Sequence, residues 1–154
     1  EMLVKGLGAR FGGGGTTADG THVVRATLAS AFGIHPRVVD GSGLSASNRT
    51  SPAQIVRVLA GMARKKVGAT WRAGFPTPGR TGTLAGRMRG TAAVNRCKAK
   101  TGTLHDVSAL SGYCKVPGGH LIGFSFLENR VDPYTAKALE DQMIPIIARY
   151  SPPS

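Results

Sequence analysis

The sequence has few acidic residues, and a long central stretch has none. Eight residues are Asp or Glu against 20 Lys and Arg, and no acid lies between Asp40 and Asp106. Twelve of the cations fall in that stretch, and the other eight equal the acids in number, so the stretch carries the whole net charge of +12. A field of one sign favours an anionic partner.

Aromatic residues are also scarce, at 6% of the chain, with Trp71 and Phe75 the only ones in the basic stretch. Nucleic-acid binding is the usual first expectation for a pI near 10.7. The sequence has neither aromatic residues interleaved with its cations nor zinc-finger spacing. Its four histidines are scattered without ligand spacing, so no metal site or cofactor is expected.

Long hydrophobic runs are absent too, and no stretch is long enough to predict a membrane span. A chain of 154 residues with 41% hydrophobic content can bury the core of one domain. It opens on Glu1 inside a predicted helix, so we expect a part of a longer protein. The absence of a signal peptide from these residues therefore says nothing about the full-length protein.

The chain has only two cysteines, Cys97 and Cys114. They lie at similar distances on either side of a predicted turn near His105-Asp106, so an antiparallel hairpin would place them opposite each other. We predict a disulfide, which would stabilise the fold by about 3 kcal/mol and suits an oxidising compartment. Two buried free thiols are the alternative.

Periodicity and turn residues predict an α+β fold in which helices cover an antiparallel meander. The expected helices cover 1–10, 17–32, a segment from the capping box of Ser51 and Gln54, and 132–150; the expected strands cover 37–39, 97–101, 107–116 and 120–127. In the last helix, one apolar face is expected to cover the sheet: Leu139, Met143, Ile146, Ile147 and Tyr150.

The sequence Lys100-Thr101-Gly102-Thr103 combines an ammonium group, two hydroxyls and a glycine beside a predicted strand. A carboxylate could be held there by the charge of Lys100 and by the hydroxyls of Thr101 and Thr103. Glycine at Gly102 would let the backbone of an extended ligand come close. Taken alone, the same letters also fit an ordinary hairpin.

Four segments together resemble a known family. They are Asp40-Gly41-Ser42-Gly43-Leu44-Ser45, Asn48-Arg49-Thr50-Ser51-Pro52, Gly82-Thr83-Leu84 with Arg87-Met88, and Ala99-Lys100-Thr101-Gly102-Thr103. In order and spacing they resemble the penicillin-binding D-alanyl-D-alanine carboxypeptidases of the DacB type (class C low-molecular-mass, peptidase S13). The resemblance runs from Glu1 to about Tyr150.

The resemblance implies the penicillin-recognising, transpeptidase-like fold and a serine peptidase that acts on peptidoglycan stem peptides ending in D-Ala-D-Ala. Such enzymes are acylated by β-lactams, work outside the cytoplasm, and carry the motifs S-x-x-K, S-x-N and K-T-G. Only K-T-G is present, because no serine here has Lys three residues later or Asn two residues later. Residues 1–154 are therefore expected to be the C-terminal part of the domain, inactive without an N-terminal portion that carries the other two motifs.

By the same resemblance, Lys100 would hold the terminal carboxylate of the substrate and tune the S-x-N serine. Thr101 and Thr103 would bond that carboxylate, and the N–H of Thr103 would be one of two oxyanion donors. Carboxypeptidase and endopeptidase action both remain open. The alternative is a basic, non-catalytic module that binds anionic polymer, either cell wall or nucleic acid.

Overall fold

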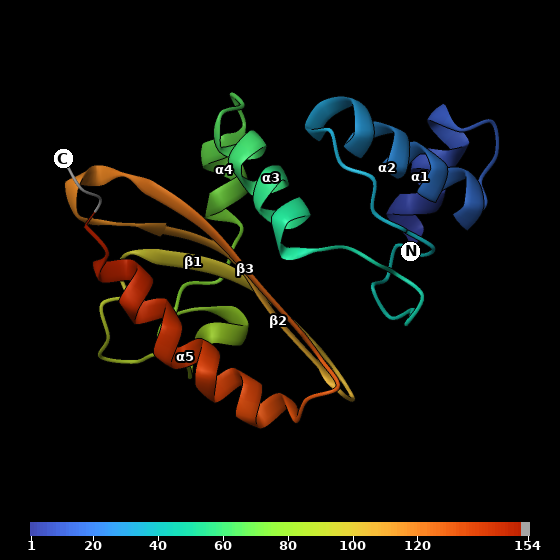
Figure 1. The fold of residues 1–154 in the computed structure, drawn as a ribbon. Coiled ribbons are helices and arrows are strands. Elements are labelled where there is room, and N and C mark those ends of the chain that lie inside the picture. Colours follow the sequence, from blue (N-terminus) through green and yellow to red (C-terminus); the bar gives the residue numbers. More distant parts are fainter. Residues whose placement is uncertain (152–154) are drawn as a thin grey trace. The chain divides into compact units, whose positions relative to one another are not determined.

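The computed structural model describes residues 1–151, and the chain divides into two compact units (Figure 1). The first unit is Glu1–Gly61 and the second is Met62–Ser154, of which residues 62–151 are described. Helices with an antiparallel sheet make up the fold, as the α+β prediction required.

The first unit is helical, and its helices are α1 (Met2–Phe11), α2 (Thr17–Phe32) and α3 (Pro52–Ala63), the last of which ends just past the unit boundary. Two glycines let α1 and α2 approach closely. A Cβ added at Gly8 would lie 2.7 Å from the N of Gly20, and one added at Gly20 would lie 1.9 Å from a carbonyl oxygen of α1. Only glycine fits at either position without moving a helix.

Side-chain caps begin two of these helices. Thr16 and Asp19 cap α2 reciprocally, each side chain accepting a hydrogen bond from the other's backbone N–H. Ser51 and Gln54 form the predicted capping box of α3, with both bonds at 3.3 Å. The prediction of a strand over 37–39 is wrong, because Arg37 pairs only with Arg49 in an isolated bridge that no neighbouring pair extends.

The second unit contains a three-stranded sheet in the order β1-β2-β3, with all pairs antiparallel. Its elements are α4 (Gly68–Ala73), the 3-10 turns η1 (Gly82–Leu84) and η2 (Pro117–Gly119), the strands β1 (Cys97–Leu104), β2 (Val107–Lys115) and β3 (Leu121–Asn129), and α5 (Pro133–Arg149). The predicted meander is confirmed, although β1 is longer than expected.

Sequence patterns did not predict α4, which is a short helix of six residues. Its Trp71 donates from Nε1 to the hydroxyl of Tyr113 on β2 over 3.2 Å. The ring of Phe75 contacts both, with centroid distances of 5.4 Å to Trp71 and 5.9 Å to Tyr113. Tertiary aromatic contacts therefore hold a helix that is too short to show a period.

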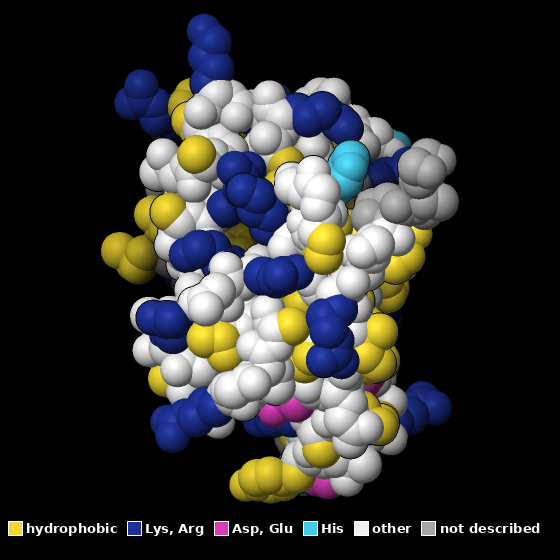
Figure 2. Space-filling view, turned by 90° about the vertical axis from the view of Figure 1, so that its left-hand side faces the viewer, with side chains coloured by type: hydrophobic (Ala, Val, Ile, Leu, Met, Phe, Trp, Pro, Cys, Tyr) yellow, Lys and Arg dark blue, Asp and Glu magenta, His cyan; other side chains and the backbone are white. Residues whose placement is uncertain are grey.

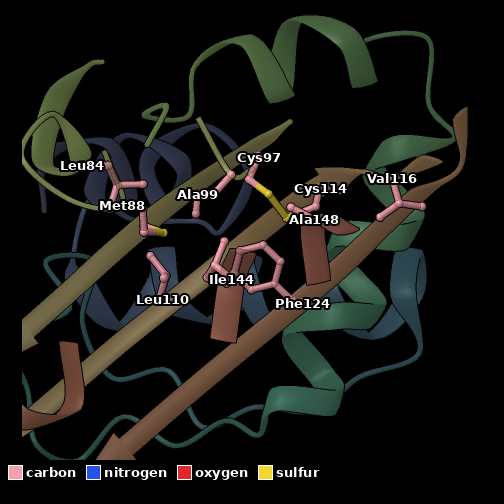
Figure 3. Close-up of a cluster of buried hydrophobic side chains, with 11 residues drawn as sticks. Leu84, Met88, Cys97, Ala99, Leu110, Cys114, Val116, Phe124, Ile144 and Ala148 are labelled. Atoms are coloured by element: carbon pink, nitrogen blue, oxygen red, sulfur yellow. A yellow bond between two sulfur atoms is a disulfide. The ribbon is translucent and has the colours of Figure 1, made fainter. Parts of the chain in front are cut away.

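The core of the second unit lies between the sheet and α5, where Leu110, Phe124 and Ile144 point toward one another (Figure 3). The predicted apolar face of α5 is partly wrong. Leu139, Ile146 and Tyr150 are exposed, whereas the buried residues of the helix are Ala136, Glu140, Ile144, Pro145 and Ala148. Small alanines bring the helix close to the sheet, and a charged partner from another segment allows a carboxylate to be buried among them.

Candidate active site

The sequence Lys100-Thr101-Gly102-Thr103 lies in β1, which is an edge strand. Its one strand partner among residues 1–151 is β2, with Lys100 opposite Ser111 and Thr103 opposite Ser108. The N–H of Ala99 donates to the carbonyl oxygen of Pro76, which is not on β2. Because main-chain groups alternate along a strand, Thr101 and Thr103 also direct their N–H and C=O groups away from β2. The edge of β1 can therefore take an added extended chain.

The ammonium group of Lys100 lies at this edge. Lys100 is exposed, and its Nζ donates to the carbonyl oxygen of Thr101 over 2.6 Å. The pleat places the Lys100 side chain on the sheet face opposite the side chains of Thr101 and Thr103. The Lys100 side chain therefore bends over the edge, which brings its charge to the side where the Thr101 and Thr103 main-chain groups point.

The two threonines of the motif share a face of β1 but differ in exposure, since Thr101 is half-buried and Thr103 is exposed. The Thr101 hydroxyl donates to Oγ1 of Thr83 in η1 over 2.8 Å. Thr83 thus fixes the rotamer of Thr101, a contact that the sequence analysis missed because the two residues lie far apart in the chain. Gly102 lies on the Lys100 face, where an added Cβ would meet Cβ of Ala109 at 3.3 Å.

A network of charged side chains is connected to the β2 residue that pairs with Thr103. Ser108, directly opposite Thr103 on β2, donates to Oε1 of Glu140 over 2.9 Å. The fully buried Glu140 also forms an ion pair with Arg87 at 2.7 Å, and Arg87 reaches Asp141 at 2.8 Å. Burial lowers the pKa of Arg87, but its bonds to Asp141 and Glu140 outweigh this and raise the pKa overall.

Glu128 on β3 stands opposite Ser108 and adds a third carboxyl, after those of Glu140 and Asp141. Its Oε2 is buried and accepts no hydrogen bond. Burial raises the pKa of Glu128, and the nearby charge of Glu140 raises it further. The sheet therefore rests on a polar layer whose charge balance depends on Arg87.

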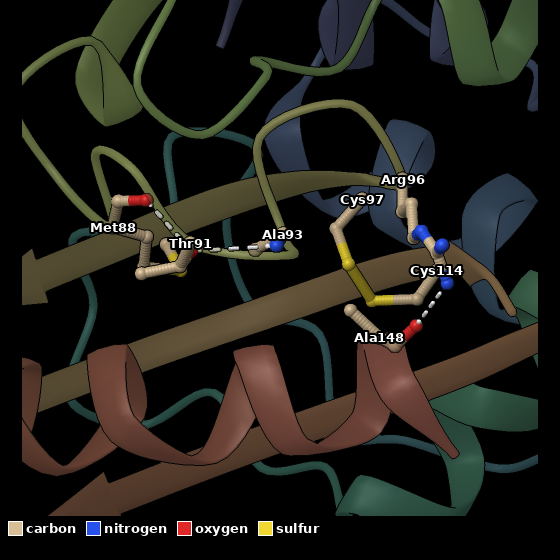
Figure 4. The surroundings of a disulfide bond; sticks show 7 residues. All are labelled: Met88, Thr91, Ala93, Arg96, Cys97, Cys114 and Ala148. Carbon is tan, nitrogen blue, oxygen red and sulfur yellow. Dashed lines mark hydrogen bonds between the residues drawn. A yellow bond between two sulfur atoms is a disulfide. The ribbon is translucent and has the colours of Figure 1, made fainter.

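A disulfide fixes the start of the motif strand. Cys97 and Cys114 are register partners with Cα atoms 4.0 Å apart, and their sulfurs are bonded (Figure 4). The predicted pairing is confirmed. Next to it, Nη1 of Arg96 donates to the carbonyl oxygen of Ala148 at the end of α5 over 3.1 Å. Both links tie the strand that carries Lys100 to its neighbours.

Residues 1–151 contain no group of three His, Cys, Asp or Glu side chains that could hold a metal ion. None of their helices is both long enough and apolar enough to cross a membrane.

The chain is similar to known peptidases over almost its whole length. It is 38% identical to a D-alanyl-D-alanine carboxypeptidase of Actinomadura sp. (strain R39), in a match that covers 98% of this chain. The chain spans only 29% of that relative's length. The DacB-type resemblance inferred from the sequence is therefore confirmed.

Solved structures share the fold. Penicillin binding protein 4 (dacB) from Haemophilus influenzae, in complex with a β-lactam, matches with a TM-score of 0.84 and 24% identity, over 96% of this chain and 37% of that one. A predatory endopeptidase from Bdellovibrio bacteriovorus matches with a TM-score of 0.70 and 16% identity, over 96% and 42% of the two chains. The family model for D-Ala-D-Ala carboxypeptidase 3 (S13) matches residues 1–150, and this chain belongs to that family.

Proposed function

We propose that this chain supplies the K-T-G strand of a serine D-Ala-D-Ala carboxypeptidase or endopeptidase that acts on peptidoglycan stem peptides and is acylated by β-lactams. The observation that carries the proposal is the edge of β1, where the Lys100 ammonium group donates to the carbonyl oxygen of Thr101 on the side that faces away from β2. Family membership and the likeness to a β-lactam complex support it.

The chemistry of this edge follows from its geometry. A stem peptide would add to β1 through main-chain hydrogen bonds. Lys100 would neutralise its terminal carboxylate, and the hydroxyl of Thr103 would donate to a carboxylate oxygen. Thr101 would donate to the carboxylate by turning its hydroxyl proton away from Thr83. The N–H of Thr103 would stabilise the oxyanion that forms when the amide carbonyl is attacked. Thr83 keeps the Thr101 hydroxyl in place before the substrate arrives.

The nucleophile belongs to another part of the proposed enzyme. A serine of S-x-x-K would attack the carbonyl, its lysine would take the proton, and water would then release the acyl group. Residues 1–154 would be the C-terminal part of the transpeptidase-like domain, completed by an N-terminal portion that carries S-x-x-K and S-x-N. The disulfide supports an extracytoplasmic location.

Labelling with a fluorescent penicillin tests where the nucleophile resides. The isolated chain should form no covalent adduct, whereas a polypeptide that joins this chain to the S-x-x-K portion should be labelled. Gel fluorescence and intact-mass measurement give the readout. An adduct on the isolated chain would overturn this division of the active site.

A substitution at Lys100 tests the role of the motif. In the longer polypeptide, Lys100→Met should lower kcat/KM for a D-Ala-D-Ala peptide by about 100-fold or more, because an electrostatic contact at the reacting centre is lost. Lys66→Met removes the same charge from an exposed position outside the motif and is the control. Equal activities of the two variants would refute the assignment of Lys100.

The second candidate is a basic module that binds anionic polymer without catalysis. The observation in its favour is that the stretch between Asp40 and Asp106 holds twelve cations and no acidic residue, so its charge is not balanced within the stretch. Salt-sensitive binding of the isolated chain to anionic cell-wall polymer, together with inactivity of the longer polypeptide, would favour this candidate.

A further inference from the structure

A cavity of about 490 Å³ lies at the start of β1, within the second unit. Its walls come from α4, the segment before β1, the first residues of β1, the end of β2 and the residues around η2. Six of its lining residues matter here: Arg72, Asn95, Arg96, Lys98, Tyr113 and Lys115. The volume lies in the range of sites that hold small ligands.

The lining is strongly basic. It includes four cations and no Asp or Glu. None of these cations takes part in an ion pair among residues 1–151. On the face on the left of Figure 1, Lys and Arg side chains gather around patches of hydrophobic surface, while Asp and Glu are few (Figure 2). Four positive charges around one hollow repel one another, so an anion that enters it relieves that repulsion.

Some of the polar groups in the cavity are held in place. Arg96 is anchored to the carbonyl oxygen of Ala148. The Tyr113 hydroxyl accepts a hydrogen bond from Trp71. Burial raises the pKa of Tyr113, against the opposing effects of that bond and of the nearby Arg72 charge. The phenol therefore stays neutral beside the cations.

The cavity lies in line with the K-T-G strand. Lys98 stands two residues before Lys100, so the two side chains share a face of β1, about 7 Å apart along the strand. Tyr113 is directly opposite Lys98 on the same face. A peptide that pairs antiparallel to β1 runs with its carboxyl end toward the start of this strand, which is where the cavity opens.

From this placement we propose that the cavity is a subsite for a side-chain carboxylate on the leaving half of the substrate. The inference rests on the proposed function, because the leaving half is the part released when the peptide bond at the K-T-G edge is cut. A single D-alanine leaves no group that could enter the cavity. The proposed enzyme thus prefers leaving groups that carry an additional carboxylate, which a cross-linked stem peptide provides.

Two matched substrates test the proposal on the longer polypeptide that contains the S-x-x-K portion. They share the acyl half and release either D-2-aminoadipate or its neutral side-chain amide, and a third substrate releases D-alanine. The unsubstituted protein should cleave the charged substrate with a kcat/KM about fivefold above that of the neutral one, the size expected of a partly exposed ionic contact. Lys98→Met and Lys115→Met should each bring that ratio toward one.

Lys66→Met is the control, because it removes one charge outside the cavity and should leave the ratio unchanged. Thermal melting of each variant separates a lost subsite from a lost fold. If the ratio is one in the unsubstituted protein, or is unaffected by both cavity variants, the subsite is refuted while cleavage of the D-alanine substrate still supports the proposed function. If no substrate is cleaved, the proposed function itself fails.

A phosphate-bearing polymer is the competing occupant of the cavity. Binding of the chain to teichoic acid that is lost in Lys98→Met but kept in Lys66→Met, together with an unchanged substrate ratio, would overturn the peptide assignment in favour of the polymer.

Discussion

The two units are stabilised in different ways. In residues 62–151 the sheet and α5 enclose a continuous apolar core crossed by a disulfide. In the fully described residues 1–61, Ile34 and Leu59 are the buried aliphatic side chains, while Met2, Leu3, Phe11 and Leu44 are exposed. The first unit relies instead on close helix contact at glycines and on hydrogen bonds to carboxylates.

Asp40 is the clearest example of such a carboxylate. It accepts hydrogen bonds from the side chains of Ser42 and Asn48 and from the backbone N–H groups of Gly43 and Ser45. The bonds from Asn48 and Ser42 contribute most to lowering its pKa to about 2. Buried apolar side chains and one buried ion-pair network thus stabilise the second unit, whereas hydrogen bonds to carboxylates have the larger share in the first.

The largest effect is expected from Arg87, where the second unit departs from a purely apolar core. Arg87→Met leaves the buried carboxylate of Glu140 without its cation, which should lower the free energy of unfolding by about 4 kcal/mol. Urea denaturation measures the loss. Arg64→Met, at an exposed position, is the control. An equal loss of unfolding free energy in both variants would mean that the ion pair of Arg87 with the buried Glu140 does not stabilise the fold.

Shortening one leucine in each unit to alanine tests whether the two units depend differently on buried apolar side chains. Leu110 is fully buried, so Leu110→Ala should cost about 3 kcal/mol through the cavity that it leaves. Leu44 is 70% exposed, and Leu44→Ala should change stability by less than about 0.5 kcal/mol. Denaturant midpoints of the two variants give the difference. Similar losses of stability in the two variants would show that the units do not differ in how much they depend on these leucine side chains.

The disulfide gives the second unit a constraint that the first lacks. Replacing both Cys97 and Cys114 by alanine should lower the free energy of unfolding by about 3 kcal/mol, because the unfolded chain gains loop freedom. Alkylation followed by mass measurement shows whether the bond is present in the parent protein. If the oxidised parent and the double variant unfold at the same urea concentration, the bond does not stabilise the fold.

The smallest effect is local and depends on pH. The pKa of Asp40 is lowered from 3.8 to about 2, so its contribution is present above pH 4 and is lost as the pH falls through about 2. Amide protection factors at Gly43 and Ser45 should therefore fall between pH 4 and pH 2. In Asp40→Ala they should be low already at pH 5. Unchanged protection in both proteins would show that this loop does not depend on the carboxylate.

Local sequence patterns predicted most of the fold because the responsible contacts are close in sequence. The Ser51–Gln54 box, the hairpin turn at His105-Asp106 and the Cys97–Cys114 pairing all follow from short-range geometry. The buried face of α5 could not be predicted in the same way. Glu140 is buried only because Arg87, 53 residues away, supplies its partner.

The same distinction, between contacts that are close in the sequence and contacts that are distant, applies to the candidate site. The motif residues could be located in the sequence, and the exposed edge of β1 follows from the order of the strands. The bond from Thr101 to Thr83 and the cationic cavity could not be predicted, because they depend on how η1 and α4 fold back onto the sheet. The role of each motif residue in catalysis remains a prediction.

The same edge of β1 that has the proposed function could also promote aggregation. Backbone groups that can accept a peptide can also accept the corresponding edge of another molecule, which is how sheets template aggregation. Lys98 and Lys100 counter this, since two like-charged edges repel each other when they approach. Replacing both by glutamine should therefore increase light scattering on storage at low ionic strength, so solubility and recognition would depend on the same ammonium groups.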